Sequence, residues 1–280
     1  MKRKLLVATC LLGLMTLKSQ TLTWAKGMGG TSLENSLAMA VDGSGNVYTT
    51  GYFQGTADFD PGPRVFNMIS SGLEDIFISK LDASGNFVWA KKFGGTTYDV
   101  GFSIAVDNSG DVYTTGYFNG TADFDPGAGV FNMTSAGIED VFVSKLDASG
   151  NFVWAKKMGG TLYDASRSIA VDGSGNVYTT GYFAGAADFD PGASVFNLTS
   201  QGSDDIFISK LDPSGNCVWA KRIGGTNVDD VYSITVDALA NVYTTGTFAG
   251  SPDFDPGAGV FGMTAFGVYD AFVHKLSGCA

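Results

Sequence analysis

The acids best placed to do chemistry belong to a five-residue motif, Asp-Phe-Asp-Pro-Gly, that occurs four times. Its two aspartates, at positions i and i+2 of an extended segment, point the same way, and the Pro-Gly pair forces a turn that can add backbone carbonyls. Hard oxygen ligands of this kind suit Ca²⁺, so the motif predicts a calcium site. Its carboxylates are those of Asp58, Asp60, Asp123, Asp125, Asp188, Asp190, Asp253 and Asp255.

A second explanation of the motif is purely structural. The aspartates can cap their own turn through backbone amides while the central residue, Phe59 in the first copy, anchors the segment. The motif is not an EF-hand loop, because its glycine comes one position early and the twelfth residue counted from Asp58 is Ile69 rather than Glu. Calcium is the one cofactor that the sequence suggests, and both explanations stay open.

Residues that break the repetition, together with the acids of the long loops, are the candidates for ligand binding. They are Arg64, Asp99, Asp164, Arg167, Asp229, Asp230 and Tyr232. No catalytic residue is assigned. His274 is the single histidine, which excludes a multi-histidine zinc site and any Ser-His-Asp triad not built on it.

The composition limits the partners. The 280 residues include 28 Asp and Glu against 17 Lys and Arg, a formal charge of −11. Nucleic acid and anionic membranes need a basic patch, so both are excluded as partners. A hydrophobic content of 44% is too high for a disordered chain. We expect a monomer whose ligand is a protein or a glycan.

The first 20 residues predict a signal peptide. Lys2, Arg3 and Lys4 precede a short apolar run, residues 5–17, which is too short to serve as a stable membrane anchor. We therefore expect export to the periplasm, the cell surface or the medium, and a single mature domain over residues 21–280.

A repeat of 65 residues determines the fold class. Trp24, Trp89, Trp154 and Trp219 are spaced by this period, and the surrounding sequence recurs with them. Each unit predicts four strands, which in the second copy begin near Ser103, Val112, Val141 and Phe152, joined alternately by short Gly-containing turns and by long loops. Four antiparallel strands per unit are typical of β-propeller blades. The sequence predicts an all-β, four-bladed propeller with repeats starting near residues 36, 101, 166 and 231.

The register of the repeat also predicts how the ring closes. The strand near residues 22–26 is a fourth copy of the outermost strand of a blade, and the last unit lacks its own. We expect this N-terminal strand to complete the last blade of the same chain and to remove the open sheet edge.

Two segments carry a family resemblance. VDGSGNVYTTGYF, from Val41, and LDASGNFVWAKK, from Leu81, with the GG that follows, resemble the SBBP-type bacterial β-propeller repeat of exported proteins. The resemblance covers the mature chain and implies a propeller at or outside the cell surface, with no established common activity. The Asp-Phe-Asp-Pro-Gly insertion departs from the pattern.

The strand directions place most acids on one face of the predicted ring. The long loops share a rim, and long connections on a rigid scaffold usually carry binding residues. Three function classes remain open: a non-catalytic binding or surface structural module, a carboxylate-based lyase or glycosidase at the channel mouth, and a calcium-stabilised structural repeat.

Overall fold

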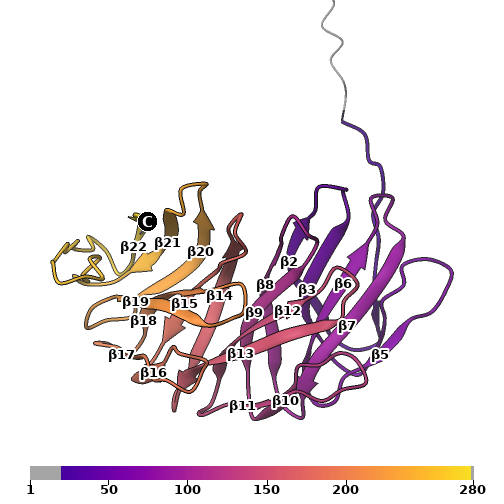
Figure 1. The fold of residues 1–280 in the computed structure, drawn as a ribbon, viewed down its shortest axis with the longest axis horizontal. Coiled ribbons are helices and arrows are strands. Elements are labelled where there is room, and N and C mark those ends of the chain that lie inside the picture. The colour runs from indigo at the N-terminus through magenta and orange to yellow at the C-terminus, as the bar shows by residue number, and fades with distance from the viewer. Residues whose placement is uncertain (1–19, 279–280) are drawn as a thin grey trace, which may run out of the picture.

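The structure is a computed structural model that describes residues 20–278. These residues contain no helix. Their longer strands form four successive antiparallel sheets, which we call the core sheets (Figure 1), and short strands near the N-terminus form a fifth. The first three core sheets have four strands each and the fourth has three. The first consists of β2 (Glu34–Val41), β3 (Val47–Phe53), β6 (Asp75–Leu81) and β7 (Phe87–Gly95). The second consists of β8 (Asp99–Val106), β9 (Val112–Phe118), β12 (Asp140–Leu146) and β13 (Phe152–Gly160).

The third and fourth core sheets continue the pattern. The third consists of β14 (Asp164–Val171), β15 (Val177–Phe183), β18 (Asp205–Leu211) and β19 (Cys217–Ile223). The fourth consists of β20 (Asp230–Val236), β21 (Val242–Phe248) and β22 (Asp270–Leu276). The all-β class and the strands predicted from the repeat are therefore confirmed, although the first strand of the second unit begins at Asp99, before Ser103.

The short turns form for the reason that the sequence suggested. Asp42 ends β2, and its Oδ1 accepts hydrogen bonds from the amides of Ser44 and Asn46, at 2.9 Å each. Gly45 has a φ of 80°, which a side chain would strain. The same arrangement recurs at the later turns, so these acids are structural.

The first three Asp-Phe-Asp-Pro-Gly insertions each form a small hairpin that the sequence did not predict, and the fourth makes only isolated bridges, of Asp253 with Gly224 and with Gly262. The hairpins are β4 (Thr56–Asp58) with β5 (Asn67–Ile69), β10 (Thr121–Asp123) with β11 (Asn132–Thr134), and β16 (Ala186–Asp188) with β17 (Asn197–Thr199). Each hairpin pairs with the outer strand of the preceding unit: β10 with β7, and β16 with β13. In the same way β4 pairs with β1 (Gly29–Gly30). The hairpins therefore join consecutive repeats.

The hydrophobic core lies between neighbouring core sheets. In the first such layer, Ile78 of β6 and Ile104 of β8 share one cluster with Phe124 of the β10–β11 hairpin. Phe124 is fully buried and contacts the rings of Phe118 and Phe142 at centroid distances of 5.3 and 5.1 Å. Equivalent residues form the next two layers. The repeated aromatic residues are thus packing residues of the core.

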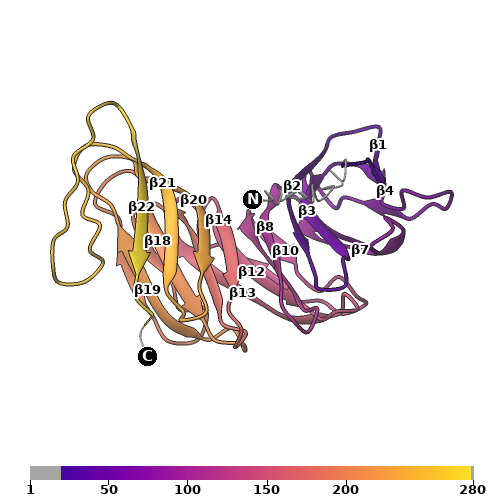
Figure 2. The same cartoon turned by 90° about the horizontal axis from the view of Figure 1, so that it is seen from above.

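The predicted ring closure is not present in the structure. The four core sheets form an open arc (Figures 1 and 2), and the fourth has only β20, β21 and β22. Trp24 lies at the first core sheet, where its indole Nε1 donates to the carbonyl of Ala83 at 3.2 Å. The 65-residue register was correct, but register alone does not fix how far each sheet rotates relative to the last.

Two further expectations concern the membrane and the N-terminus. No helix within residues 20–278 is long and apolar enough to cross a membrane. The predicted signal peptide, residues 1–20, falls outside the described residues except for its last position.

Candidate functional site

The carboxylates of the Asp-Phe-Asp-Pro-Gly motif hold the backbone of their own hairpin. Asp58 Oδ1 accepts hydrogen bonds from the amides of Asp60 and Phe66, at 3.0 and 2.8 Å. Asp60 Oδ1 accepts one from Gly62, at 2.8 Å. The other three copies make the same bonds. This geometry is the structural explanation given above, with Phe59 buried as the anchor.

Calcium binding at this motif stays a prediction. Within residues 20–278 no group of three or more His, Cys, Asp or Glu side chains is arranged to hold a metal ion. Any calcium bound by one motif would have two carboxylates and otherwise backbone or water oxygens as ligands.

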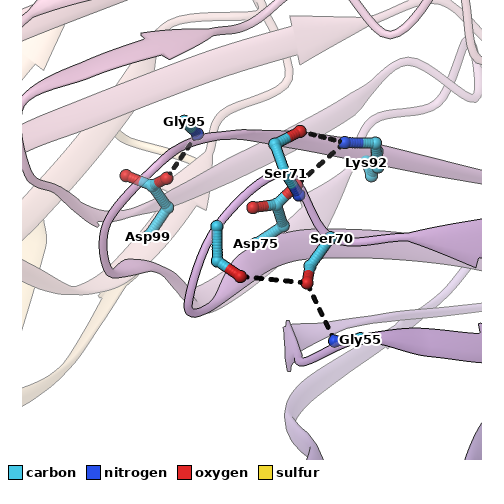
Figure 3. A network of polar contacts seen from close by, with 8 residues as sticks. Gly55, Ser70, Ser71, Asp75, Lys92, Gly95 and Asp99 are labelled. Carbon is cyan, nitrogen blue, oxygen red and sulfur yellow. Dashed lines mark hydrogen bonds and ion pairs between the residues drawn. The ribbon is translucent and has the colours of Figure 1, made fainter.

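A second set of acids lies at the junctions of the core sheets and is fully buried. Asp99, at the start of β8, accepts hydrogen bonds from the amides of Gly95 and Asn119, at 2.7 and 3.2 Å. Next to it, Asp75 of β6 forms an ion pair with Lys92 at 2.9 Å (Figure 3). Asp164 and Asp229 bond the equivalent amides of the later units. The predicted candidates Asp99, Asp164 and Asp229 therefore fix the loops between units.

Burial changes the acidity of these groups. It raises the pKa of Asp99 to about 7, and the nearby charge of Asp75 acts in the same direction, whereas the two backbone hydrogen bonds oppose it. Burial likewise raises the pKa of Asp164 to about 7, with Asp140 adding to the effect. The pKa of Asp229 is also raised by burial.

The structure brings three of the predicted ligand candidates together at one cavity. Arg167, Asp229 and Asp230 line a cavity of about 330 Å³ between the third and fourth core sheets. Tyr163, Tyr182, Asp204 and Val228 complete its wall. The cavity lies at the rim of the long loops and combines one cation, acids and aromatic rings.

Arg167 reaches this cavity because it is the extra residue of a β-bulge. The pairing of β14 with β15 shifts between Ser166 and Ser168, which leaves Arg167 unpaired in the ladder. A bulge turns its side chain away from the regular alternation. The other first strands have the same shift, at Leu37, Phe102 and Tyr232. The bulge is therefore common to all four units, while its residue differs in each.

Two aromatic rings hold the Arg167 guanidinium. Its central carbon lies 4.8 Å from the centre of the Phe102 ring and 5.1 Å from that of Tyr182. Cation–π contacts of this kind orient a guanidinium without using its hydrogen-bond donors. The buried Nε atom has no hydrogen-bond partner among the described residues. The Arg167 side chain is thus held by its ring contacts, with Nε buried and unsatisfied.

The acids around Arg167 are partly desolvated. Burial raises the pKa of Asp230, and the positive charge of Arg167 opposes this rise. Burial also raises the pKa of Asp204, and the negative charges of Asp230 and Asp205 add to it. Glu139 has a pKa raised by burial and lowered in part by Arg167. The cavity therefore holds acids of reduced acidity beside one fixed cation.

The remaining predicted candidates lie elsewhere. Arg64 is exposed in the first insertion. Tyr232 occupies the bulge of β20, is 56% exposed and shares a hydrogen bond with Thr247 at 3.1 Å. Sequence reasoning missed Tyr163, Tyr182 and Asp204, because they occupy positions where other units have similar residues. The informative signal was the bulge position, which holds Leu37, Phe102, Arg167 and Tyr232 in the four units and is charged in only one of them.

Comparison with known families agrees with this architecture. The family described as the SBBP β-propeller repeat matches residues 88–125, 153–182 and 218–247. The protein carries SBBP-type β-propeller repeats. The predicted resemblance is thus confirmed. The first match begins in the outer strand β7 of one core sheet and ends in the hairpin insertion of the next, so the SBBP repeat spans the junction at which the buried acids lie.

Two curated proteins show a weaker similarity to these SBBP repeats. An uncharacterized WD repeat-containing protein of Acanthamoeba polyphaga mimivirus is 29% identical over 198 residues, which is 61% of this chain and 14% of that protein. The regulatory protein FlaEY of Caulobacter vibrioides is 26% identical over 174 residues, which is 59% of this chain and 17% of that protein. The chain thus spans less than a fifth of the length of either relative.

Proposed function

We propose that the protein is an exported, non-catalytic binding module of the β-propeller type that holds a glycan in the Arg167 cavity. The observation that carries the proposal is the break in repetition at this point. One bulge position, equivalent in four units, holds arginine only here, and this arginine lies between two rings beside a cavity. Ligand sites typically combine a concave surface with a few convergent polar groups.

The chemistry of the cavity suits a sugar. Hydroxyl groups both donate and accept, so they can pair with the Asp204 and Asp230 carboxylates and with the Arg167 guanidinium at the same time. The ring of Tyr163, 48% exposed at the cavity wall, offers an apolar face against which the CH groups of a sugar ring can pack. A nucleic acid would meet acids here, which agrees with the acidic composition.

The test is binding of the purified protein to a panel of glycans and cell-wall fragments, followed by calorimetry on each positive. We expect Arg167→Ala to weaken binding at least about tenfold, equivalent to ~1.4 kcal/mol. Arg64→Ala is the matched control, because it removes an arginine exposed in the first insertion, and it should bind as the wild type does. Equal binding by Arg167→Ala and wild type would refute the assignment of the site.

A carboxylate-based glycosidase or lyase is the second candidate. Asp204 and Asp230 line the same cavity, and each has a pKa raised by burial, as a general acid requires. Incubation with the glycans that bind, followed by assay for new reducing ends or unsaturated products, separates the two functions. Product formation that is lost in Asp230→Asn would support the enzyme and contradict the binding module.

The proposal that the protein is exported is based on the predicted signal peptide, residues 1–20. Secretion by an intact cell with cleavage near Ser19 or Gln20, seen by N-terminal sequencing of the mature protein, is the expected result. An uncleaved protein retained in the cytoplasm would contradict export.

A further inference from the structure

The two ends of the arc are complementary. Residues 20–30 lie against the first core sheet as each outer strand lies against the next sheet in line. Trp24 donates to the Ala83 carbonyl as Trp89 donates to that of Ala148 in the second sheet. Gly29 and Gly30 pair with the β4 strand as the end of β7 pairs with β10. The N-terminal segment therefore occupies the place of an outer strand, and no core sheet within residues 20–278 contains it.

The other end of the arc has the reverse arrangement. The third strands β6, β12 and β18 each pair with an outer strand, β7, β13 and β19. In the fourth core sheet β22 pairs with β21, and no segment within residues 20–278 pairs with its other edge. An unpaired edge strand is a ready template for a further strand.

The side chains at the two ends also match. Met39 of β2 is 67% exposed, although its equivalents in the other units, such as Ile104, are almost fully buried. Val273 of β22 is 82% exposed, although its equivalents, such as Ile78, are fully buried. Ile78 and Ile104 belong to the same cluster between the first and second core sheets. Met39 and Val273 are thus the two halves of one more layer of this kind.

A second unsatisfied pair lies at the outer edge. In the first unit Phe66 of the insertion packs on Phe87 of β7, with ring centroids 4.8 Å apart. In the fourth unit the equivalent Phe261 is 64% exposed, and the residue 65 positions before Phe87 is Leu22, which is 84% exposed. Leu22 and Phe261 are the pair that a completed sheet would bring into contact, and Phe66, which has its partner, is 39% exposed against 64% for Phe261.

We propose that these ends join two copies of the chain, head to tail. The three layers between core sheets use equivalent residues, so each layer sets a similar rotation, and four sheets at that rotation leave the ends apart (Figure 2). Closing one chain on itself would require the rotation between sheets to change at every layer. A second copy, in contrast, offers its β2 face and N-terminal segment to β22 of the first copy without any such change. Two arcs give eight sheets, within the range of known propellers, and the two identical junctions close the ring.

The oligomeric state tests the proposal. Light scattering after size exclusion should give twice the chain mass of 29.2 kDa for the intact chain. Val273→Asp places a charge in the proposed junction and should give the single chain mass while the circular dichroism spectrum stays that of the folded β-sheet protein, because Val273 is exposed in one copy. Its melting temperature should fall, since association no longer stabilises the folded state. The matched control Val130→Asp changes a valine that is 71% exposed in the second insertion, and it should remain a dimer. A monomeric wild type, or a Val273→Asp dimer, would overturn the proposal.

Cross-linking distinguishes two copies from one chain closed on itself. In a background with the native cysteines replaced by serine, one protein carries Met39→Cys and the other Val273→Cys. A short bismaleimide should cross-link the mixture to twice the chain mass and should leave each protein alone uncross-linked. A chain that carries both changes and cross-links only within itself would instead demonstrate the four-sheet ring and refute the dimer.

Discussion

The hairpin motif and the Arg167 cavity both lie among the long loops, but they differ in repetition. The motif occurs four times with the same hydrogen bonds, and its acids are consumed by their own backbone. The Arg167 cavity lies at a bulge that is common to all units, and Arg167, Asp204 and Asp230 line it. The repeated acids therefore have a structural role here, and the proposed site lies where one unit carries a residue that the other three do not.

The largest expected effect concerns the anchor of a hairpin. Phe124→Ala removes a fully buried ring that packs against Phe118 and Phe142, and we expect it to lower the free energy of unfolding by about 3–5 kcal/mol. Urea denaturation measures this change. Phe131→Ala is the control from the same hairpin, where the ring is 39% exposed, and its effect should be clearly smaller. Equal effects would mean that the anchor does not hold the hairpin.

The buried junction acids make stability depend on pH. The pKa values of Asp99 and Asp164 are about 7 in the folded protein, against about 4 in an unfolded chain. The folded protein binds more protons between these values, so the free energy of unfolding should fall by a few kcal/mol as the pH rises through this range, and level off above it. Urea titrations at a series of pH values measure the slope. The double variant Asp99→Asn with Asp164→Asn should have a smaller dependence of the free energy of unfolding on pH. An unchanged dependence would mean that other groups cause it.

The capping acids should have a smaller effect. Asp123→Ala leaves the amides of Asp125 and Phe131 without their acceptor, and we expect a loss of about 1–2 kcal/mol in the free energy of unfolding. Arg167→Ala, which removes a residue of the cavity, should cost less, about 1 kcal/mol, through its lost ring contacts. Thermal and urea unfolding of both variants test this order, and a reversed order would contradict the assignment of structure to the motif and binding to the cavity.

The smallest expected effect is that of calcium. Because one oxygen of each motif aspartate already accepts backbone hydrogen bonds, we expect melting curves in chelator and in excess calcium to coincide. A melting temperature that rises with calcium concentration would show binding by mass action and restore the calcium site. The variant with Asp58 and Asp60 changed to Asn would then localise it.

The sequence predicted the core sheets well, because a period of 65 residues with fixed turns leaves little choice of strand. It missed the hairpins, since a strand of three residues such as β10 is too short to show alternation. The sequence also predicted that one chain closes its own ring, and the structure shows an open arc instead. The register of Trp24 was correct, but the rotation between sheets depends on side-chain packing, which the register does not determine. For the site it found Arg167, Asp229 and Asp230 but missed Tyr182, which the adjacent strand β15 brings next to Arg167.

The pairing of each hairpin with the outer strand of the unit before it has a consequence for how such a chain can grow. The first two boundaries are bridged by the same strand pairing and the third by the bridge between Gly224 and Asp253. Recombination between two copies at any matching position therefore removes or adds 65 residues and leaves each remaining insertion facing an outer strand. The pairing between each insertion and the outer strand before it is therefore kept, whichever position is exchanged. Gene duplication can therefore lengthen this arc one unit at a time, and the chain at each step keeps the pairing between consecutive units.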